Sequence, residues 1–165
     1  MDGLEIRLAR EDEYPAVGEL TVEANLADRL VRDEYLPELR DAAARAAAGE
    51  LLVALDSTTG ELVGTASLFV ASAGPRWAEG AEEADAVLRM LAVASKARRR
   101  GIGRALAEEC ISRARGLGCQ RLVLSTGVWM TAARSLYEEL GFERAPGADW
   151  EPLPGVALLA YRLAL

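Results

Sequence analysis

The sequence contains no histidine, and this absence excludes several kinds of catalytic and metal site. Without an imidazole there is no histidine zinc ligand and no Ser–His or Cys–His nucleophile pair. The two cysteines, Cys110 and Cys119, are too few for a disulfide framework or a zinc site. We therefore expect no bound metal, and carboxylates are the abundant candidates for acid–base chemistry.

Long apolar runs are also missing, and lysine is limited to Lys96. No stretch approaches the roughly 18 apolar residues of a membrane helix. The first residues alternate charged and apolar side chains, where a signal peptide would have a basic and then an apolar region. We expect a cytoplasmic protein with reduced thiols.

The length and charge of the chain indicate a globular protein with acidic character. Its 165 residues suit one domain, and we predict a single domain over residues 1–165. Hydrophobic residues make up 51% and charged residues 27%, as in ordinary soluble proteins. Acids outnumber bases by 26 to 19, which argues against nucleic acid and anionic membranes as partners and is compatible with a cationic substrate.

The hydrophobic pattern predicts alternating strands and helices, which is typical of a mixed α/β fold. Residues 50–71 read as a hairpin that turns at Ser57–Gly60, and residues 72–85 as a loop. The nearly continuous apolar run at 87–93 indicates a central strand. Cys110 and Leu117 are expected on the apolar face of a helix. Strands are predicted at 4–8, 50–56, 61–71, 87–93, 119–127, 142–145 and 156–165, and helices at 11–27, 35–48, 101–117 and 131–140.

Residues 96–104 (KARRRGIGR) form a short basic segment in an otherwise acidic chain. The segment holds five of the 19 basic residues and no acid. Gly101 and Gly103 lie where the helix after the central strand begins. Glycine lets the backbone approach a ligand closely, and the first N–H groups of a helix attract anions. We therefore predict a phosphate or pyrophosphate site here.

Two common phosphate motifs do not fit this segment. The G-x-G-x-x-G fingerprint needs a small residue where Leu106 stands, and a P-loop motif is missing. What fits is R-x-x-G-x-G at Arg98, Gly101 and Gly103, followed by AARSLYEELGF. On these residues the chain resembles the GNAT family of acetyl-CoA-dependent N-acetyltransferases, closely over 87–143 and in element order throughout. The resemblance implies the α/β GNAT acyl-CoA N-acyltransferase fold, with a central mixed twisted sheet flanked by helices, in a bacterial protein.

The resemblance also implies acetyl-CoA as the co-substrate and names the residues that would hold it. The strand before the loop is expected to contain a bulge and to splay from its neighbour, with the Leu91 N–H near the thioester carbonyl. Met130 stands where many members have asparagine, and Ser95 where proline is common. The implied cofactor-binding residues are Leu91, Ala92, Val93, Arg98, Arg99, Arg100, Gly101, Ile102, Gly103 and Arg104.

For catalysis, the resemblance implies direct attack of a primary amine on the thioester through a tetrahedral intermediate, without an acyl-enzyme. Tyr137, in A-x-x-L-Y-x-x-L-G-F, matches the tyrosine that protonates the departing thiolate. A plain core tyrosine is the alternative for Tyr137. Glu83 or Asp85 is expected as the general base, and a solvated acidic loop is the alternative there.

The acceptor amine, on a small molecule or a protein, is not readable from the sequence. Segments 11–48, 72–85 and 146–156 are expected to shape its site. They contain the carboxylates Glu23, Glu34 and Asp149, and Trp77, Trp129 and Trp150 either line that site or pack in the core. A non-catalytic module that senses acetyl-CoA or CoA is the alternative function. We expect a monomer or homodimer with no nucleic-acid or membrane partner.

Overall fold

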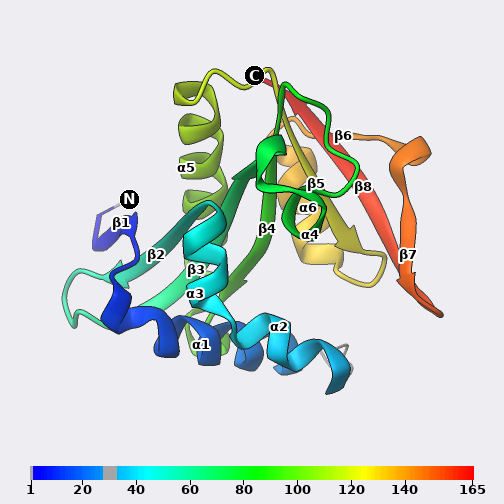
Figure 1. Ribbon diagram of the computed structural model, residues 1–165. Coiled ribbons are helices and arrows are strands. Elements are labelled where there is room, and N and C mark those ends of the chain that lie inside the picture. The colour runs from blue at the N-terminus through cyan, green and yellow to red at the C-terminus, as the bar shows by residue number, and fades with distance from the viewer. Residues whose placement is uncertain (1, 28–32) are drawn as a thin grey trace. The chain divides into compact units, whose positions relative to one another are not determined.

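The computed structural model describes residues 2–27 and 33–165 (Figure 1). The strands form a sheet in the order β1-β2-β3-β4-β5-β8-β6, with β7 paired to β8. The β4–β5 pair is parallel, whereas β1–β2, β2–β3 and β5–β8 are antiparallel. The expected mixed α/β class is confirmed. The strands are β1 Leu4–Leu8, β2 Glu50–Asp56, β3 Leu62–Val70, β4 Asp85–Val93, β5 Arg121–Gly127, β6 Glu143–Arg144, β7 Trp150–Leu153 and β8 Val156–Ala164.

The α-helices and short 3₁₀ turns alternate with these strands. The α-helices are α1 Tyr14–Ala27, α2 Leu36–Arg40, α3 Ala42–Ala48, α4 Pro75–Ala78, α5 Ile102–Gly116 and α6 Thr131–Glu139. The 3₁₀ turns are η1 Glu11–Glu13, η2 Asp33–Tyr35, η3 Ala71–Ala73, η4 Ser95–Ala97 and η5 Pro146–Ala148. Among the described residues, no helix is long and apolar enough to cross a membrane.

The chain divides into two compact units, and their boundaries fall within β3, β4 and α5. Unit 1 contains Met1–Leu68 and Met90–Cys110, and unit 2 contains Phe69–Arg89 and Ile111–Leu165. The single-domain organisation stays a prediction.

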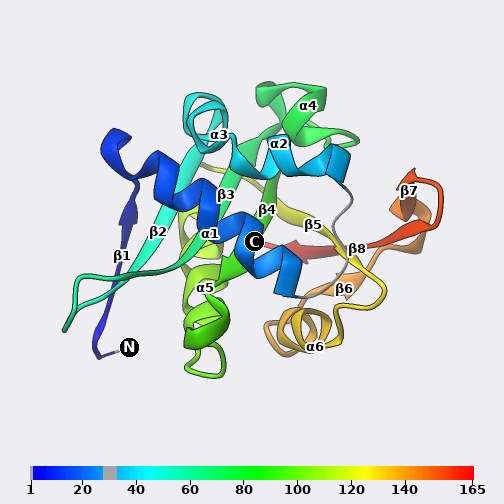
Figure 2. The same ribbon diagram turned by 90° about the horizontal axis from the view of Figure 1, so that it is seen from below.

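In unit 1, helices cover both faces of β2 and β3. Figure 2 shows α1, α2 and α3 on one side of these strands and α5 on the other. Residues 51–55 of β2 are accordingly all buried, although successive side chains of a strand point to opposite faces. One side of this core contains Val17, Ala42, Leu51, Val53 and Leu55.

The predicted helix 35–48 was wrong in one respect, because two helices meet at Asp41 in its place. Asp41 leaves the helical conformation (φ −80°, ψ 61°), and its carboxylate accepts a hydrogen bond from the Ala44 N–H at 3.1 Å. The fully buried Arg45 guanidinium donates to the carbonyls of Glu38 and Leu39, both at 3.0 Å. These contacts give hydrogen-bond partners to the backbone groups that the break leaves without helical partners. The prediction of one helix rested on the high helix propensity of the alanine-rich sequence.

In unit 2, β5 pairs with β8 along its whole length and with β4 at its start. Seven residue pairs join β5 to β8, and the parallel register joins Asp85–Val87 to Arg121–Val123. Figure 2 shows α4 and α6 on opposite sides of β5. The side chains of Leu122 and Leu124 are buried in the core of this unit.

Three further expectations in unit 2 needed correction. The predicted loop 72–85 contains α4, because Trp77 stacks on Phe69 with ring centroids 5.1 Å apart and anchors a helical turn. No strand was predicted between 145 and 156, where β7 in fact pairs with β8. Leu117 is 51% exposed, because α5 ends at Gly116 before the apolar face reaches it. Cys110 is buried as expected.

Candidate functional site

The basic segment lies entirely in unit 1 and forms the turn between η4 and α5. Arg99 (φ 64°) and Gly101 (φ 76°) both adopt the left-handed conformation there. Glycine adopts this conformation without strain, whereas Arg99 has a Cβ atom and adopts it at a cost of roughly 1–2 kcal/mol. Two left-handed residues two positions apart turn the chain sharply into the first turn of α5. Backbone amides in such a turn are a known form of anion-binding concavity.

The first turn of α5 adds further donors to this concavity. The Ala105 N–H donates to the Gly101 carbonyl at 3.0 Å, and this bond begins the helical series. The N–H groups of Ile102 and Gly103 come before it and have no acceptor within the helix. They lie at the positive end of a 15-residue helix, where an anion is stabilised.

Several basic side chains of the segment bind other parts of unit 1. Arg100 donates to the Asp56 carboxylate at 2.9 Å, and this bond lowers the pKa of that carboxyl below its usual value. Arg98 donates to the Ala24 carbonyl at 3.0 Å, near the C-terminus of α1. Lys96 pairs with Glu61. Fewer positive side chains are therefore available to a ligand than the arginine-rich sequence indicates. The backbone amides provide the larger part of the candidate anion site.

Strand β4 leads into the same turn and contains an irregularity at Met90. Met90 has φ 52°, a left-handed conformation that breaks the regular pleat of the strand. This is the strand where the resemblance implies a bulge. Leu91, Ala92 and Val93 follow directly, so unit 1 holds all ten predicted cofactor-binding residues. Their contacts with acetyl-CoA stay a prediction.

The carboxylate of Glu23 on α1 fixes the start of η4. It accepts hydrogen bonds from the Ser95 hydroxyl and, at 3.3 Å, from the Ser95 N–H. Together with the Arg98–Ala24 bond, this contact ties the last turns of α1 to both ends of η4. Sequence reasoning placed Glu23 in an acceptor-lining segment and missed this contact. No local signal identifies it, because Glu23 and Ser95 are 72 residues apart.

The predicted catalytic residues all lie in unit 2, where Tyr137 on α6 is 6% exposed. Its ring centroid lies 5.5 Å from that of Phe142 and 6.5 Å from that of Tyr161. Tyr137 thus packs in an aromatic cluster, and its role as an acid stays a prediction.

The two predicted bases differ in their surroundings. Asp85 is 4% exposed, and its carboxylate accepts from the Arg121 guanidinium at 2.7 Å and from the Glu82 N–H at 2.9 Å. Both oxygens of the Asp85 carboxylate therefore already accept hydrogen bonds within unit 2. Glu83 lies exposed in the turn before β4. Their roles in proton transfer stay predictions.

Neither cysteine has the surroundings of an activated nucleophile. Cys110 is fully buried, and burial raises the pKa of the Cys119 thiol, with a further increase from the Asp85 charge. A raised pKa leaves less of the reactive thiolate at neutral pH. Among the described residues, no group of three or more acidic or cysteine side chains is arranged to bind a metal ion.

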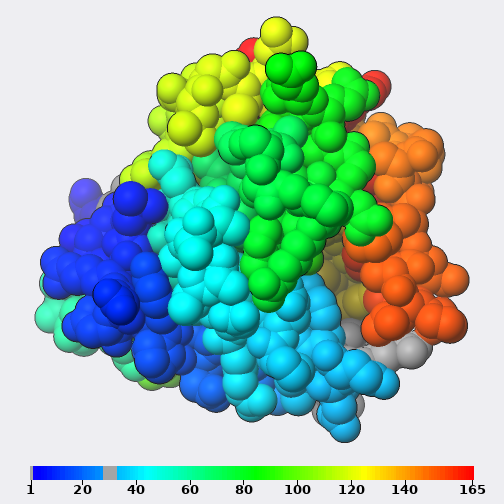
Figure 3. Space-filling model, viewed as in Figure 1, coloured from blue at the N-terminus to red at the C-terminus, as the bar shows by residue number. Residues whose placement is uncertain are grey.

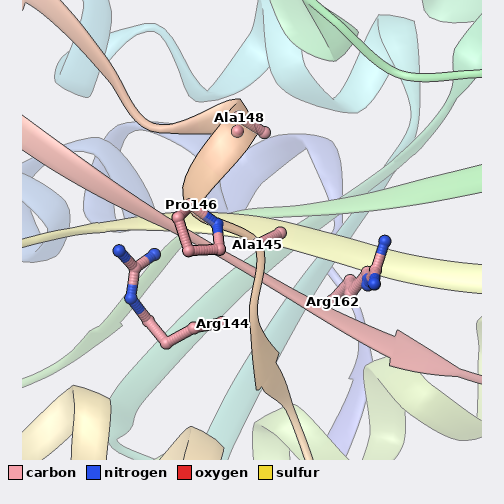
Figure 4. A pocket seen from close by; sticks show the side chains of 6 residues that line it. Arg144, Ala145, Pro146, Ala148 and Arg162 are labelled. Atoms are coloured by element: carbon pink, nitrogen blue, oxygen red, sulfur yellow. The ribbon is translucent and has the colours of Figure 1, made fainter.

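Two shallow pockets in unit 2 have none of the predicted catalytic residues in their lining. One, of about 360 Å³, is lined by 144–148 and Arg162, and Figure 4 shows Arg144 and Arg162 on either side of Pro146. The other, of about 400 Å³, shares Arg162 and includes Arg121 and Glu143. In the first pocket, Arg144 forms an ion pair with Asp149 at 2.6 Å, so its charge is already neutralised.

The family comparison agrees with these features. The model of the acetyltransferase (GNAT) family matches residues 8–142, so the chain belongs to the GNAT family. No curated protein matched the chain.

Solved structures with a similar fold include GNAT proteins from several bacteria. A GNAT-family acetyltransferase from Staphylococcus aureus Mu50 has 17% identity and a TM-score of 0.75, with 98% of this chain and 99% of that chain covered. A GCN5-related N-acetyltransferase from Kribbella flavida has 26% identity and a TM-score of 0.73, with 99% of each chain covered. A GNAT-family acetyltransferase from Elizabethkingia anophelis, solved with acetyl-CoA bound, has 20% identity and a TM-score of 0.70, and the match covers both chains fully.

Proposed function

We propose that this protein transfers the acetyl group of acetyl-CoA to a primary amine. The observation that supports the proposal most is the turn formed by Arg99 and Gly101 in front of α5. Its left-handed residues and the first N–H groups of the helix suit the diphosphate of coenzyme A. The residues present in unit 1 therefore fit this co-substrate.

Each predicted residue has a distinct task in this reaction. Bound acetyl-CoA supplies an activated thioester. The Leu91 N–H donates to the thioester carbonyl and stabilises the negative charge that develops there, an effect worth about 3 kcal/mol for one preorganised donor. Tyr137 donates a proton to the departing thiolate. Glu83 takes the proton of the amine, directly or through water, and Asp85 is the second candidate.

The proposed acceptor is a small molecule or a protein with a primary amine. We further propose that the protein works in the cytoplasm, as a monomer or homodimer, without nucleic-acid or membrane partners. The segment 11–48, expected to shape the acceptor site, includes residues 28–32, which lie outside the described residues.

A matched pair of glycine variants tests the diphosphate site. Gly101 (φ 76°) and Gly118 (φ 78°) are both exposed and left-handed, so a Gly→Glu change strains both backbones similarly. At a hundredfold excess over Kd, acetyl-CoA stabilises the unchanged protein by about 2.7 kcal/mol, measured as a rise in Tm. Gly101→Glu abolishes this rise because its carboxylate repels the diphosphate, and Gly118→Glu keeps it. A full rise in Tm with Gly101→Glu contradicts the assignment.

Thiol release separates catalysis from mere binding. The unchanged protein is incubated with acetyl-CoA and a panel of amino acids, polyamines, aminoglycosides and peptide N-termini. An amine-dependent release of free thiol supports the acetyltransferase. A rise in Tm with acetyl-CoA but no release with any amine supports the sensor module.

A further inference from the structure

One face of β5 in unit 2 carries an aromatic surface that the proposed function leaves without a task. The Thr126 hydroxyl contacts the Met130 sulfur at 3.6 Å, next to the first residue of α6, so the Thr126 side chain points to the α6 side. Because side chains alternate along a strand, Ser125 and Gly127 point to the opposite face. Both lie at the C-terminal end of β5, the end at which parallel strands of α/β sheets commonly bind ligands.

The indole of Trp129 lies directly on this face. A Cβ atom at Gly127 would come within 2.5 Å of the Trp129 ring, so the ring packs against the bare backbone of the strand. This close approach requires glycine at position 127. The half-buried Trp129 ring is therefore fixed over the end of β5.

A second indole, from β7, reaches the same face. Trp150 pairs with Leu158 of β8, and Leu158 pairs with Gly127 of β5, so the three positions share one side of the sheet. The Trp150 Nε1 donates to the Ser125 hydroxyl at 3.4 Å, while 42% of the residue remains exposed. We call the surface formed by Ser125, Gly127, Trp129 and Trp150 the β5 floor.

Figure 3 shows a hollow in unit 2 at this place. It lies between the green segment that carries α4 and the orange segment that carries β7, with the olive-yellow of β5 at its bottom. An exposed indole beside a hollow is unusual for a residue whose only task is packing, because burial would remove its large apolar area from water.

The polar groups around the β5 floor decide which chemistry it suits. Asp149 precedes Trp150, but Arg144 and the Ala160 N–H occupy both its oxygens, and the bond from Arg144 holds the pKa of Asp149 at about 2. Its charge is thus neutralised by a partner of the same unit and is not directed at a ligand. The floor offers aromatic faces and one hydroxyl, which suit a planar apolar group, and the paired Asp149 carboxylate provides no free anion for a second cationic group.

We propose that the β5 floor binds the aryl group of the acceptor, so that the substrates are arylalkylamines. This inference rests on the proposed function. The amine attacks the thioester carbonyl and forms the C–N bond, and the tetrahedral intermediate then collapses and breaks the C–S bond. The amine nitrogen loses one proton, and the departing thiolate gains one. The aryl group takes no part in this exchange, and its stacking on Trp129 and Trp150 orients the amine.

Turnover with two amines tests the specificity. In the unchanged protein, 2-phenylethylamine has a kcat/KM at least about tenfold above that of ethylamine, because only the former can stack on the indoles. Trp150→Ala reduces this ratio about tenfold, through the KM for 2-phenylethylamine and not the KM for acetyl-CoA. Trp150→Phe retains most of the preference. Leu117→Ala, which also shortens an exposed apolar side chain of unit 2, leaves the ratio as it is.

Calorimetric titration of 2-phenylethylamine, with coenzyme A present, tests binding without turnover. Saturable binding to the unchanged protein that is lost in Trp150→Ala supports the β5 floor, even if no amine is acetylated and the proposed function fails. Equal kcat/KM values for 2-phenylethylamine and ethylamine overturn the inference, as does a ratio of these values that Trp150→Ala leaves unchanged. The inference is also overturned if 2-phenylethylamine does not bind while acetyl-CoA still raises the Tm. That result does not contradict the proposed diphosphate site.

Discussion

At the scale of single residues, the partner of a charged side chain decides whether that charge can serve a ligand. Arg100 is bound to Asp56, and Asp85 is bound to Arg121. A charge that already has a partner must lose that partner before it meets a new one. The backbone amides at the start of α5 have no such competing partner within the helix, so they are expected to contribute most to the proposed diphosphate site.

Tyr137 can be tested by removing only its hydroxyl. If this group protonates the leaving thiolate, Tyr137→Phe lowers kcat by about a hundredfold and leaves the KM for acetyl-CoA nearly constant. Steady-state thiol release measures both constants.

Tyr161 provides the matched control in the same aromatic cluster. Its hydroxyl donates to Glu138 at 2.9 Å and accepts from Arg134 at 3.3 Å. Tyr161→Phe therefore costs about 1 kcal/mol of stability without lowering kcat as Tyr137→Phe does. Equal kcat values for the two variants would show that Tyr137 is not the proton donor.

At the scale of elements, α5 approaches β3 closely because residue 64 is glycine. A Cβ atom there would lie 2.9 Å from Leu106 Cδ1 and 3.0 Å from Ile102 Cγ2, both on the first two turns of α5. It would also lie 3.3 Å from the Ala92 carbonyl of β4. The helix that carries the proposed diphosphate site is therefore positioned by a residue nearly 40 places earlier in the chain.

Gly64→Ala tests this positioning. Overpacking reduces the free energy of unfolding by about 1–3 kcal/mol, and displacement of Ile102 also weakens acetyl-CoA binding. Gly116→Ala is the control, since a Cβ atom at the end of α5 meets nothing within 4 Å. It leaves binding unchanged and adds up to about 1 kcal/mol of stability. Denaturant unfolding and the acetyl-CoA-induced rise in Tm check both variants.

At the scale of the whole molecule, each unit contains an ion pair that lowers the pKa of a carboxyl. In unit 1, hydrogen bonds from Arg7 lower the pKa of Glu13 from 4.5 to about 2. In unit 2, hydrogen bonds from Arg144 lower the pKa of Asp149 from 3.8 to about 2. Both pairs therefore stabilise the folded chain in the same range of pH.

The pH dependence follows from the direction of these two changes. Because the folded pKa values lie below the unfolded ones, the unfolded chain binds more protons in acid, and stability falls as the pH drops from about 4 to about 2. Denaturant unfolding at a series of pH values measures this slope. Asp149→Asn removes one of the two groups and makes the slope shallower. A slope identical to that of the unchanged protein would show that the Arg144–Asp149 pair does not contribute.

Local patterns predicted most elements, and the failures have specific causes. The hairpin of β2 and β3 and the helix α6 follow from their hydrophobic patterns and from turn residues or glycine at their ends, and β4 follows from its nearly continuous apolar run. The four residues of α4 and of β7 are too short for a periodic signal, and they depend on the Trp77–Phe69 stack and on pairing with β8. Asp41 breaks a helix that its neighbours favour, because its carboxylate caps α3.

The sequence by itself determined the family, and it encodes the loop that we propose binds the diphosphate. The features of the loop, a left-handed glycine and the start of a helix, are encoded within nine consecutive residues, 96–104. Only the tertiary structure decided which distant groups meet, such as Glu23 with Ser95, and Trp150 with Ser125. Such contacts depend on strand register and on the closure of long loops, so they involve the free energy of the whole fold and leave no local pattern in the sequence.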